Sequence, residues 1–200
     1  MKDIKNKEIF KLIKPNIEYK EQAIEDINEF RKNKSSINGV GGLHRYLDDY
    51  EGWLDKLEKD RNVTLDEDRV PTETFFLVRE IDNKIIGMIN IWLGLNERLR
   101  NSCGNIGYSI RPTERKKGYN KINLYLGLLE CKKYGLKKVM LDCDKDNLGS
   151  AKTIQALCGE LEKEYYDSNI YNCMIQVYWI DVDYAIENKA NEFQKYIINE

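Results

Sequence analysis

The spacing of apolar residues along the first third of the chain predicts a short strand followed by two helices. Residues 8–13 form a short strand-like run that is closed by Lys14-Pro15. Apolar side chains then recur every three or four residues over 19–31 and again over 43–57, the spacing of helices that bury one face. The segment 35–42, rich in Ser and Gly, separates the two predicted helices.

Beyond Pro71 the pattern changes to short apolar runs separated by polar turns, which indicates strands alternating with helices. The predicted elements are strands over 74–78, 85–92 and 106–110, a loop over 96–103, a helix over 118–134, a strand over 138–141, a helix over 150–157, strands over 160–166 and 170–180, and a last helix from Asp183 onward. Hairpins before a β-helix-β-helix stretch predict a mixed α/β (α+β) fold with a mostly antiparallel central sheet. A doubly wound nucleotide-binding sheet is not expected.

Composition narrows the class of protein without naming it. A chain of 200 residues favours one domain, and 32 basic against 34 acidic residues argue against a dedicated nucleic-acid binder. No apolar run approaches the ~20 residues that a membrane helix needs. The N-terminus lacks the apolar core of a signal peptide, so we expect a cytoplasmic protein with no membrane partner.

Metal and disulfide chemistry is not expected. The cysteines, 5 in number, form no C-x-x-C pair, and His44 is the single histidine. The spacing of acidic residues over 142–146 imitates the start of a calcium loop. The sixth position of that loop is Asn147 rather than Gly and the twelfth is Thr153 rather than Glu, so we reject calcium.

The segment 104–120 carries the most informative chemistry. A predicted strand ends at Arg111-Pro112, a basic turn over 115–117 follows, and a helix begins near Gly118. Free backbone N–H groups at a helix start bind anions, and Gly lets a phosphate come close. The alternative is an ordinary turn whose charges face water.

These residues resemble the GNAT superfamily of N-acetyltransferases, in particular one bacterial branch of predicted acetyltransferases. Arg115-x-x-Gly118-x-Asn120 matches the family's [Arg/Gln]-x-x-Gly-x-[Gly/Ala] loop at its first two fixed positions. Asp146-Asn147 followed by Ser150 resembles the family's second motif, and the resemblance extends over residues 39–180.

The resemblance implies one acetyltransferase-like domain over 1–200, with an acceptor-side part at 1–70, an acetyl-CoA core at 71–180 and a C-terminal tail or helix at 181–200. Two central strands would splay to admit acetyl-CoA, the co-substrate. The implied cofactor-binding residues are Ser109, Ile110, Arg111, Arg115, Lys116, Lys117, Gly118, Tyr119, Asn120, Asn147 and Ser150. The implied reaction moves an acetyl group to a primary amine of a small molecule or peptide, in a monomer or homodimer. The alternative is a non-catalytic CoA-binding or regulatory module.

The catalytic groups depart from the family's pattern. Ile154 stands where many members carry a Tyr general acid, and Asn105 where many carry Glu or His. Cys158-Gly159 stands where a Gly-Gly or Gly-Phe pair is usual. The remaining candidates are Tyr108, Asp142 and Asp144, each of which also has a structural interpretation. 

Acidic residues also crowd the loop that would lie near the substrate mouth: Asp66, Glu67, Asp68 and Glu73. They favour a small basic acceptor, although a loop of charges that only face water is an equally good interpretation.

Overall fold

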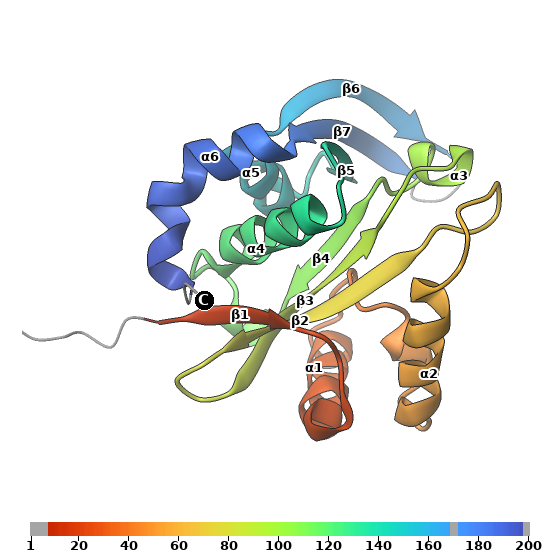
Figure 1. Cartoon of the computed structure of the whole chain (residues 1–200), viewed down its shortest axis with the longest axis vertical. Helices are drawn as coiled ribbons and strands as arrows, with labels where there is room; N and C mark the ends of the chain where they lie inside the picture. Colours follow the sequence, from red (N-terminus) through yellow and green to blue (C-terminus); the bar gives the residue numbers. More distant parts are fainter. Residues whose placement is uncertain (1–7, 169–171, 198–200) are drawn as a thin grey trace, which may run out of the picture.

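The chain folds into two antiparallel sheets with helices on both sides, and the computed structural model describes residues 8–168 and 172–197 (Figure 1). The first sheet has the order β1-β2-β3-β4 and the second the order β5-β7-β6. The strands are β1 Phe10–Ile13, β2 Thr72–Arg79, β3 Lys84–Trp92, β4 Ile106–Ile110, β5 Lys138–Asp144, β6 Glu160–Asp167 and β7 Cys173–Asp181. The helices are α1 Lys20–Lys32, α2 Tyr50–Arg61, α3 Glu97–Arg100, α4 Tyr119–Lys133, α5 Leu148–Ala156 and α6 Val182–Phe193. The predicted fold class is therefore confirmed.

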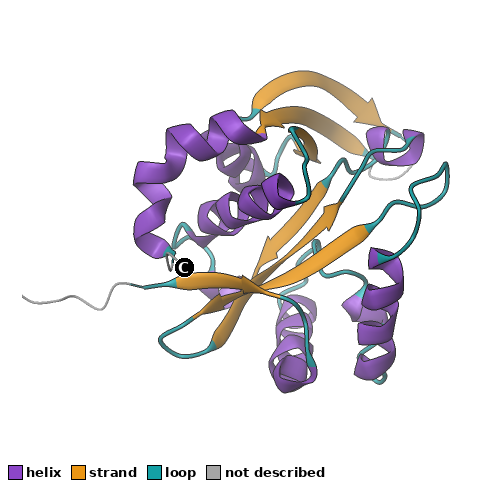
Figure 2. Cartoon of the chain, viewed as in Figure 1, coloured by secondary structure: helices purple, strands orange, loops and turns teal. Residues whose placement is uncertain are grey.

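The first sheet is buried on both faces, which explains the continuous apolar run of β2. Alternate residues of a strand point to opposite faces. Phe76 and Val78 pack in the core formed with α1 and α2, whereas Phe75 and Leu77 pack in the core formed with α4. Figure 2 shows α1 and α2 below this sheet and α4 on its other side, between the sheet and α6.

Asn105, just before β4, joins the two sheets. Its Nδ2 donates to the carbonyls of Trp92 (3.1 Å) and Gly94 (3.2 Å), and its Oδ1 accepts from the backbone N–H of Met140 (2.9 Å). Its backbone N–H donates to the Met140 carbonyl at 2.7 Å. Beyond this junction β4 and β5 belong to different sheets, so the predicted splaying of the central strands is confirmed.

Glycine is required beside this junction. Gly104 has φ +63°, and a Cβ there would lie 2.3 Å from the Met140 carbonyl oxygen. A side chain would push β5 away from Asn105, so the close approach of the two strands depends on Gly104.

Two predicted boundaries were wrong because a cap was missed. The helix expected over 43–57 begins only at Tyr50, since the Asp49 side chain accepts from the Gly52 N–H and fixes the start; residues 43–45 form a separate 3₁₀ turn. The predicted loop over 96–103 contains α3, whose start Asn96 caps. The strand expected from residue 170 begins at Cys173 in the described part of the chain; residues 169–171 lie outside it.

The last helix, expected from Asp183, is confirmed as α6. No helix within residues 8–168 and 172–197 has both the length and the apolar character to cross a membrane.

Candidate functional site

A cavity of about 700 Å³ opens where β4 and β5 diverge. Its walls come from the loop before α2, from β4, from the turn between β4 and α4, from the end of β5 and from the start of α5. Ligand pockets typically occupy about 300–1,000 Å³, so the cavity is large enough for an extended small molecule.

The turn before α4 presents backbone donors to this cavity. Lys116 (φ +64°) and Gly118 (φ +85°) both take the left-handed conformation. Among the described residues, the backbone N–H groups of 116–120 find no protein acceptor. Successive free amides at a helix start form a concave anion site. The geometry therefore fits a phosphate or diphosphate.

Glu114 anchors this turn through a network of ion pairs. It is buried, and its carboxylate accepts from Lys84 (2.8 Å) and Lys117 (2.7 Å) and lies 3.3 Å from Arg79. Burial alone would favour the neutral acid, but the two lysine hydrogen bonds and the Arg79 charge outweigh it and lower the Glu114 pKa to about 2. These ion pairs hold the turn to the first sheet, and Glu114 itself lies in the cavity wall.

Helix α1 holds the other side of the turn through Glu29. This carboxylate accepts from Arg111 Nε at 2.5 Å and from the Thr113 N–H at 2.7 Å. Burial opposes ionisation of Glu29, yet the hydrogen bonds from Arg111 and Thr113 lower its pKa. Arg115, the first motif residue, donates to the Ile110 carbonyl at 3.1 Å and lies over the Phe30 ring.

Most of the cofactor-binding residues predicted from the sequence line this cavity, namely Ser109, Ile110, Arg115, Lys116, Gly118, Tyr119, Asn120, Asn147 and Ser150. Arg111 and Lys117 do not line it. Arg111 is buried against Glu29 and Glu25, and Lys117 pairs with Glu114, so both side chains position the turn instead of facing the cavity.

The three catalytic candidates also line the cavity. The Tyr108 hydroxyl lies 2.8 Å from Ser150 Oγ. Burial raises the pKa of Tyr108 well above its ordinary value, so this phenol stays protonated at neutral pH. On β5, burial and the charges of Asp144 and Asp167 raise the Asp142 pKa to about 7. Asp144 itself is exposed and accepts weakly from Cys173 Sγ at 3.5 Å.

The positions that depart from the family's pattern have structural roles. Ile154 is completely buried in the core beneath α5. Cys158, which follows that helix, takes the left-handed conformation with φ +62°. Asn120 donates from Nδ2 to Thr153 Oγ1 at 3.4 Å, which ties the first turn of α4 to α5.

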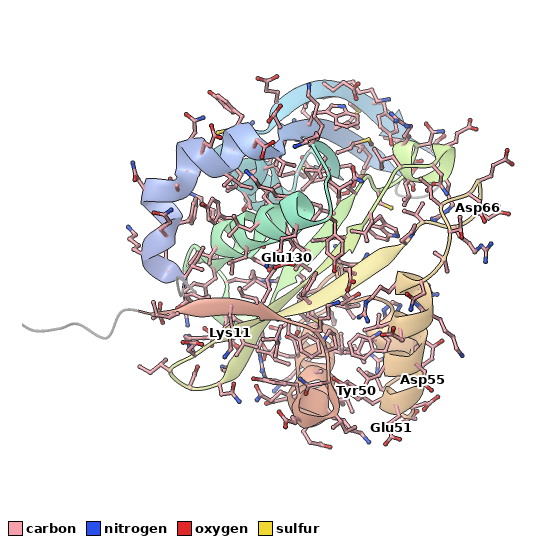
Figure 3. All side chains as sticks on the ribbon, viewed as in Figure 1. Lys11, Tyr50, Glu51, Asp55, Asp66 and Glu130 are labelled. Atoms are coloured by element: carbon pink, nitrogen blue, oxygen red, sulfur yellow. The ribbon has the colours of Figure 1, made fainter. Side chains whose placement is uncertain are left out.

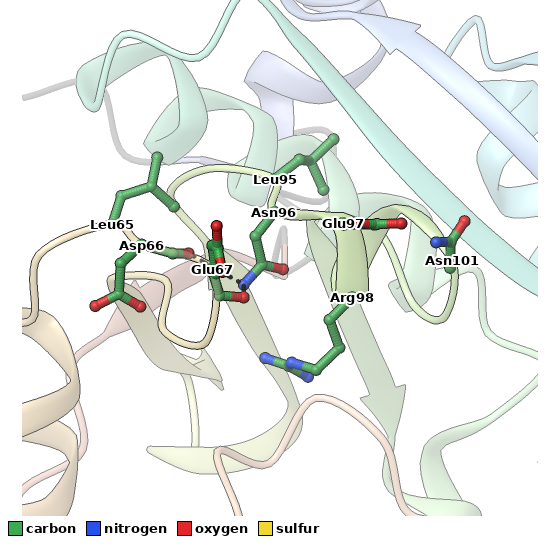
Figure 4. A pocket seen from close by; sticks show the side chains of 8 residues that line it. All are labelled: Leu65, Asp66, Glu67, Leu95, Asn96, Glu97, Arg98 and Asn101. Atoms are coloured by element: carbon green, nitrogen blue, oxygen red, sulfur yellow. Dashed lines mark hydrogen bonds between the residues drawn. The ribbon is translucent and has the colours of Figure 1, made fainter.

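The acidic loop divides between two environments. Asp66 and Glu67 line a second, open cavity of about 790 Å³ beside Asn96, whose Nδ2 donates to the Glu67 carbonyl at 2.9 Å (Figure 4). Figure 3 shows Asp66 projecting from the loop between α2 and β2. Its ion pair with Arg69 (2.8 Å) partly offsets its charge.

Glu73 does not belong to this loop, contrary to the prediction. It lies in β2 with 1% of its surface exposed. Its Oε1 lies 3.2 Å from Lys14 Nζ, 2.8 Å from Arg61 Nε and 2.8 Å from the Tyr134 hydroxyl. A buried, neutralised carboxylate of this kind cannot attract a ligand to the molecular surface.

Comparison with known families decides the assignment. The model of the acetyltransferase (GNAT) family matches residues 42–159, which is more than half of the chain. The chain belongs to the GNAT acetyltransferase family. The matched region includes the Asn105 junction, the turn before α4 and the Asn147 cap, so the resemblance stated from these motifs is confirmed.

Several solved structures are similar to this GNAT chain in fold. The microcin C7 self-immunity acetyltransferase MccE in complex with acetyl-CoA and AMP has a TM-score of 0.61 at 18% identity, covering 86% of this chain and 92% of that one. RimJ of Mycobacterium smegmatis in complex with CoA-disulfide has a TM-score of 0.68 at 12% identity, covering 92% and 88%. The ribosomal-protein-S5-alanine acetyltransferase of Vibrio fischeri has a TM-score of 0.58 at 20% identity, covering 87% and 92%. A search of curated protein sequences found no match.

Some residues of the GNAT cavity were missed by sequence reasoning. Lys121 and Lys152 line it, as do Trp92, Cys103 and part of the loop over 35–39. The two lysines were visible only as polar positions of predicted helices. The loop appeared only as a break, because nothing local shows that Gly39 lies against the backbone of Gly107.

Proposed function

We propose that this GNAT-family chain transfers an acetyl group from acetyl-CoA to a primary amine of a small molecule or a peptide, by direct attack of the amine. The observation that carries the proposal is the continuity of one cavity. It joins the amide-lined turn of 116–120 to the proton-transfer groups Tyr108 and Asp142. Binding of acetyl-CoA in MccE, a protein of similar fold, is consistent with this assignment.

The residues present fit acetyl-CoA at its most charged part. The free amides of 116–120 and the positive end of the α4 dipole suit a diphosphate, and the network behind Glu114 keeps the turn in place. Asn147 and Ser150, at the start of α5, would contact the arm that leads into the cavity. The ligand supplies the thioester whose acyl group is transferred.

The acceptor must lose a proton before or during attack, because an ammonium ion has no lone pair. Asp142 is the proposed proton acceptor. It lines the cavity, and with a pKa of about 7 it is partly protonated and partly ionised at neutral pH. A base whose pKa lies near the working pH is the most effective.

The leaving sulfur must gain a proton, and the Tyr108–Ser150 pair is the proposed source. The Tyr108 phenol is protonated at neutral pH and already touches Ser150 Oγ at 2.8 Å. One of the two hydroxyls can donate its proton to the sulfur. The oxygen that has lost the proton can then accept a hydrogen bond from the other hydroxyl. This pair would serve in place of the Tyr that many family members carry at the position of Ile154.

We further propose that the acceptor is a small basic amine. The carboxylates that line the cavity on β5 are Asp142 and Asp144, while Asp66 and Glu67 lie in the neighbouring cavity. Negative groups at a cavity mouth raise the local concentration of cations. With Glu73 buried, the expected attraction rests on the β5 carboxylates more than on the loop.

The alternative is a scaffold that binds CoA without turnover. Loss of catalysis would be expected to leave apolar residues at the centre of the cavity. Instead, Tyr108, Ser150 and Asp142 keep ionisable or hydrogen-bonding groups there, and this favours the enzyme.

The test is a thiol-release assay with acetyl-CoA over polyamines, amino acids, aminoglycosides and peptide N-termini. We expect at least one basic amine to accelerate release, and Tyr108→Phe to slow that release by about 10²–10⁴-fold. Acetyl-CoA at about a hundred times its dissociation constant should stabilise the fold by about 2.7 kcal/mol. Stabilisation without amine-dependent release would support the non-catalytic module. No stabilisation at millimolar acetyl-CoA would contradict both.

A further inference from the structure

Helix α1 carries a buried carboxyl that the proposed mechanism does not use. Asp26 is 0% exposed, and neither of its oxygens has a hydrogen-bond partner among the described residues. It lies on the buried face of α1 with Ala23 and Ile27, which belong to the apolar core formed with α2 and the first sheet. The side chains that β2 and β3 contribute to this core carry no charge, namely Phe76, Val78, Ile85 and Met88. Buried polar groups are normally paired, so an unpaired carboxyl in an apolar core requires an explanation.

The charges that act most on Asp26 come from α1 itself and from the segment after β4. Arg111 and Arg115, which flank the 3₁₀ turn of that segment, attract the ionised form of Asp26. Glu25 and Glu29, on the same helix, repel it. Loss of hydration is the largest effect and outweighs the two arginines, so the pKa rises to about 7. Asp26 therefore changes its charge close to neutral pH, beside residues that lead into the turn before α4.

Both arginines already have acceptors that hold this segment in place. Arg111 donates through Nε to Glu29 at 2.5 Å. Arg115 donates through Nε to the Ile110 carbonyl at 3.1 Å. Neither guanidinium donates to Asp26 in this arrangement. A buried negative charge without a partner is strongly unfavourable, so an ionised Asp26 must draw one of these guanidinium groups away from its present acceptor. The segment that leads to the free amides would then lose one of its anchors.

We infer that Asp26 makes binding of the acyl donor depend on pH: while Asp26 is protonated the turn before α4 keeps its binding shape, and ionisation of Asp26 weakens the binding of CoA. Two effects act in the same direction. Ionised Asp26 competes for the arginines that brace the turn, and it adds a negative charge near a site for an anion.

The direction of the proton exchange follows from linkage. A ligand that binds the protonated form of Asp26 more tightly must raise the pKa of Asp26, so binding of CoA should take up protons at neutral pH. The inference rests on the proposed function, because it concerns the same ligand. It adds a regulatory property, since the chain should hold CoA more tightly in mildly acidic than in mildly alkaline solution.

The experiment is calorimetric binding of CoA to the wild type and to Asp26→Asn at about pH 6 and at about pH 8, on either side of the Asp26 pKa of about 7. Asn keeps the shape of the neutral acid and does not titrate. We expect the dissociation constant of the wild type to rise about fivefold more than that of the variant between these pH values. Asp142 and the phosphates of CoA are common to both measurements, so their contributions cancel. Glu21→Gln, which removes an exposed carboxyl from the same helix, should follow the wild type.

A second measurement leaves residue 26 unchanged. Dephospho-CoA lacks the 3′-phosphate, which ionises at about pH 6. The variant Asp142→Asn lacks the cavity carboxyl whose pKa is also about 7. Binding of dephospho-CoA to this variant should still take up protons at neutral pH, seen as a binding enthalpy that depends on the ionisation enthalpy of the buffer.

Two results would overturn the role of Asp26 and leave the proposed function intact. One is an equal pH dependence of CoA binding in the wild type and in Asp26→Asn. The other is binding of dephospho-CoA to Asp142→Asn without proton uptake. Failure of the wild type to bind CoA at either pH would overturn the proposed function itself. Melting of Asp26→Asn no more than about 2 °C below the wild type at the lower pH verifies that the variant is folded.

Discussion

At the scale of single residues, burial raises the pKa of Asp142 and so suits this side chain to accept the proton of the amine. Its pKa of about 7 means that it can accept a proton above pH 7 and loses this ability as the pH falls below 7. Asp142→Asn keeps the size of the side chain but cannot take up a proton. We expect the variant to lose about 10²–10⁴-fold in kcat/KM and to lose the wild-type decline near pH 7.

The measurement is a pH–rate profile of both proteins with the same amine, whose own ionisation contributes equally to the two curves. Asp144→Asn is the matched control, since Asp144 is exposed on the same strand. It should raise KM for a cationic amine and keep the decline, displaced to lower pH because the Asp144 charge contributes to the raised Asp142 pKa. An unchanged profile in Asp142→Asn would remove Asp142 from the mechanism.

Asn120 is the residue at which the phosphate loop departs from the family's Gly or Ala. Its donor nitrogen is directed to Thr153, and its buried Oδ1 has no hydrogen-bond partner among the described residues. An acceptor oxygen beside a phosphate repels it, and the side chain crowds a tight backbone cradle. Asn120→Ala should therefore tighten CoA binding several-fold, roughly 1 kcal/mol.

Calorimetry on the Asn120 variants shows whether the Asn120 side chain weakens or strengthens CoA binding. Asn120→Asp has the same shape and places a full negative charge at the site, so it should bind CoA more weakly than the wild type. Weaker binding by the alanine variant would instead identify Asn120 as a phosphate ligand.

The residue scale also shows what local sequence can predict. The turn of 115–120 was recognised because its donors come from consecutive residues. The roles of Arg111 and Lys117 were not. Glu29, the partner of Arg111, becomes a neighbour only in the folded chain. Glu114 is only three residues from Lys117, but its burial, which makes it the anchor of the turn, depends on the fold. A basic run does not by itself show which cation faces a ligand.

At the scale of elements, Asn105 determines the shape of the cavity. Its side chain makes three hydrogen bonds that hold β3, β4 and β5 together at one end and leave them free to diverge at the other. Asn105→Asp would replace the donor by a carboxylate facing two buried carbonyls. We expect a loss of about 2–4 kcal/mol in the free energy of unfolding, and weaker CoA binding in the folded fraction.

Urea denaturation followed by calorimetry tests this role of Asn105. Asn188→Ala, which removes an exposed amide from α6, should change neither quantity. An Asp variant as stable as the wild type would show that the junction is held by the backbone bonds of residue 105 alone.

Periodicity predicted the elements better than it predicted their ends. The strands of the first sheet and the helix over 118–134 follow directly from apolar spacing. The helix expected over 43–57 shares one apolar stripe with the 3₁₀ turn before it, so spacing alone could not show the break at Asp49. A helix cap depends on a single side chain, and the periodic spacing of apolar residues carries no information about that side chain.

At the scale of the whole molecule, two kinds of carboxyl act on stability in opposite directions. Glu114 is held ionised by Lys84, Lys117 and Arg79, and its pKa falls from an ordinary 4.5 to about 2. Asp26 on α1 is 0% exposed with no hydrogen-bond partner for either oxygen among the described residues, and burial raises its pKa from 3.8 to about 7. Neither state was visible in the sequence, because each depends on neighbours from distant segments.

The sign of each contribution follows from which state binds more protons. Glu114 stabilises the fold above its unfolded pKa of 4.5, and this stabilisation is lost as the pH falls through about 2. Asp26 acts in the other direction: between 3.8 and about 7 the unfolded chain releases the proton that the folded chain keeps, so stability falls as the pH rises. Asp142, also raised to about 7, adds to this fall. The free energy of unfolding should therefore be greatest at about pH 4, where these opposing contributions balance.

The variant Asp26→Asn isolates the contribution of Asp26 to the pH dependence of the free energy of unfolding, since an amide does not titrate. We expect the wild type to lose about 2–4 kcal/mol more than this variant between pH 5 and pH 8, a large fraction of the stability of a domain. Urea denaturation of both proteins at these pH values measures the difference, with Glu21→Gln, an exposed carboxyl on the same helix, as the control. Parallel stability curves for the wild type and Asp26→Asn would mean that Asp26 stays ionised in the folded chain, where Arg111 and Arg115 are the charges able to hold it so.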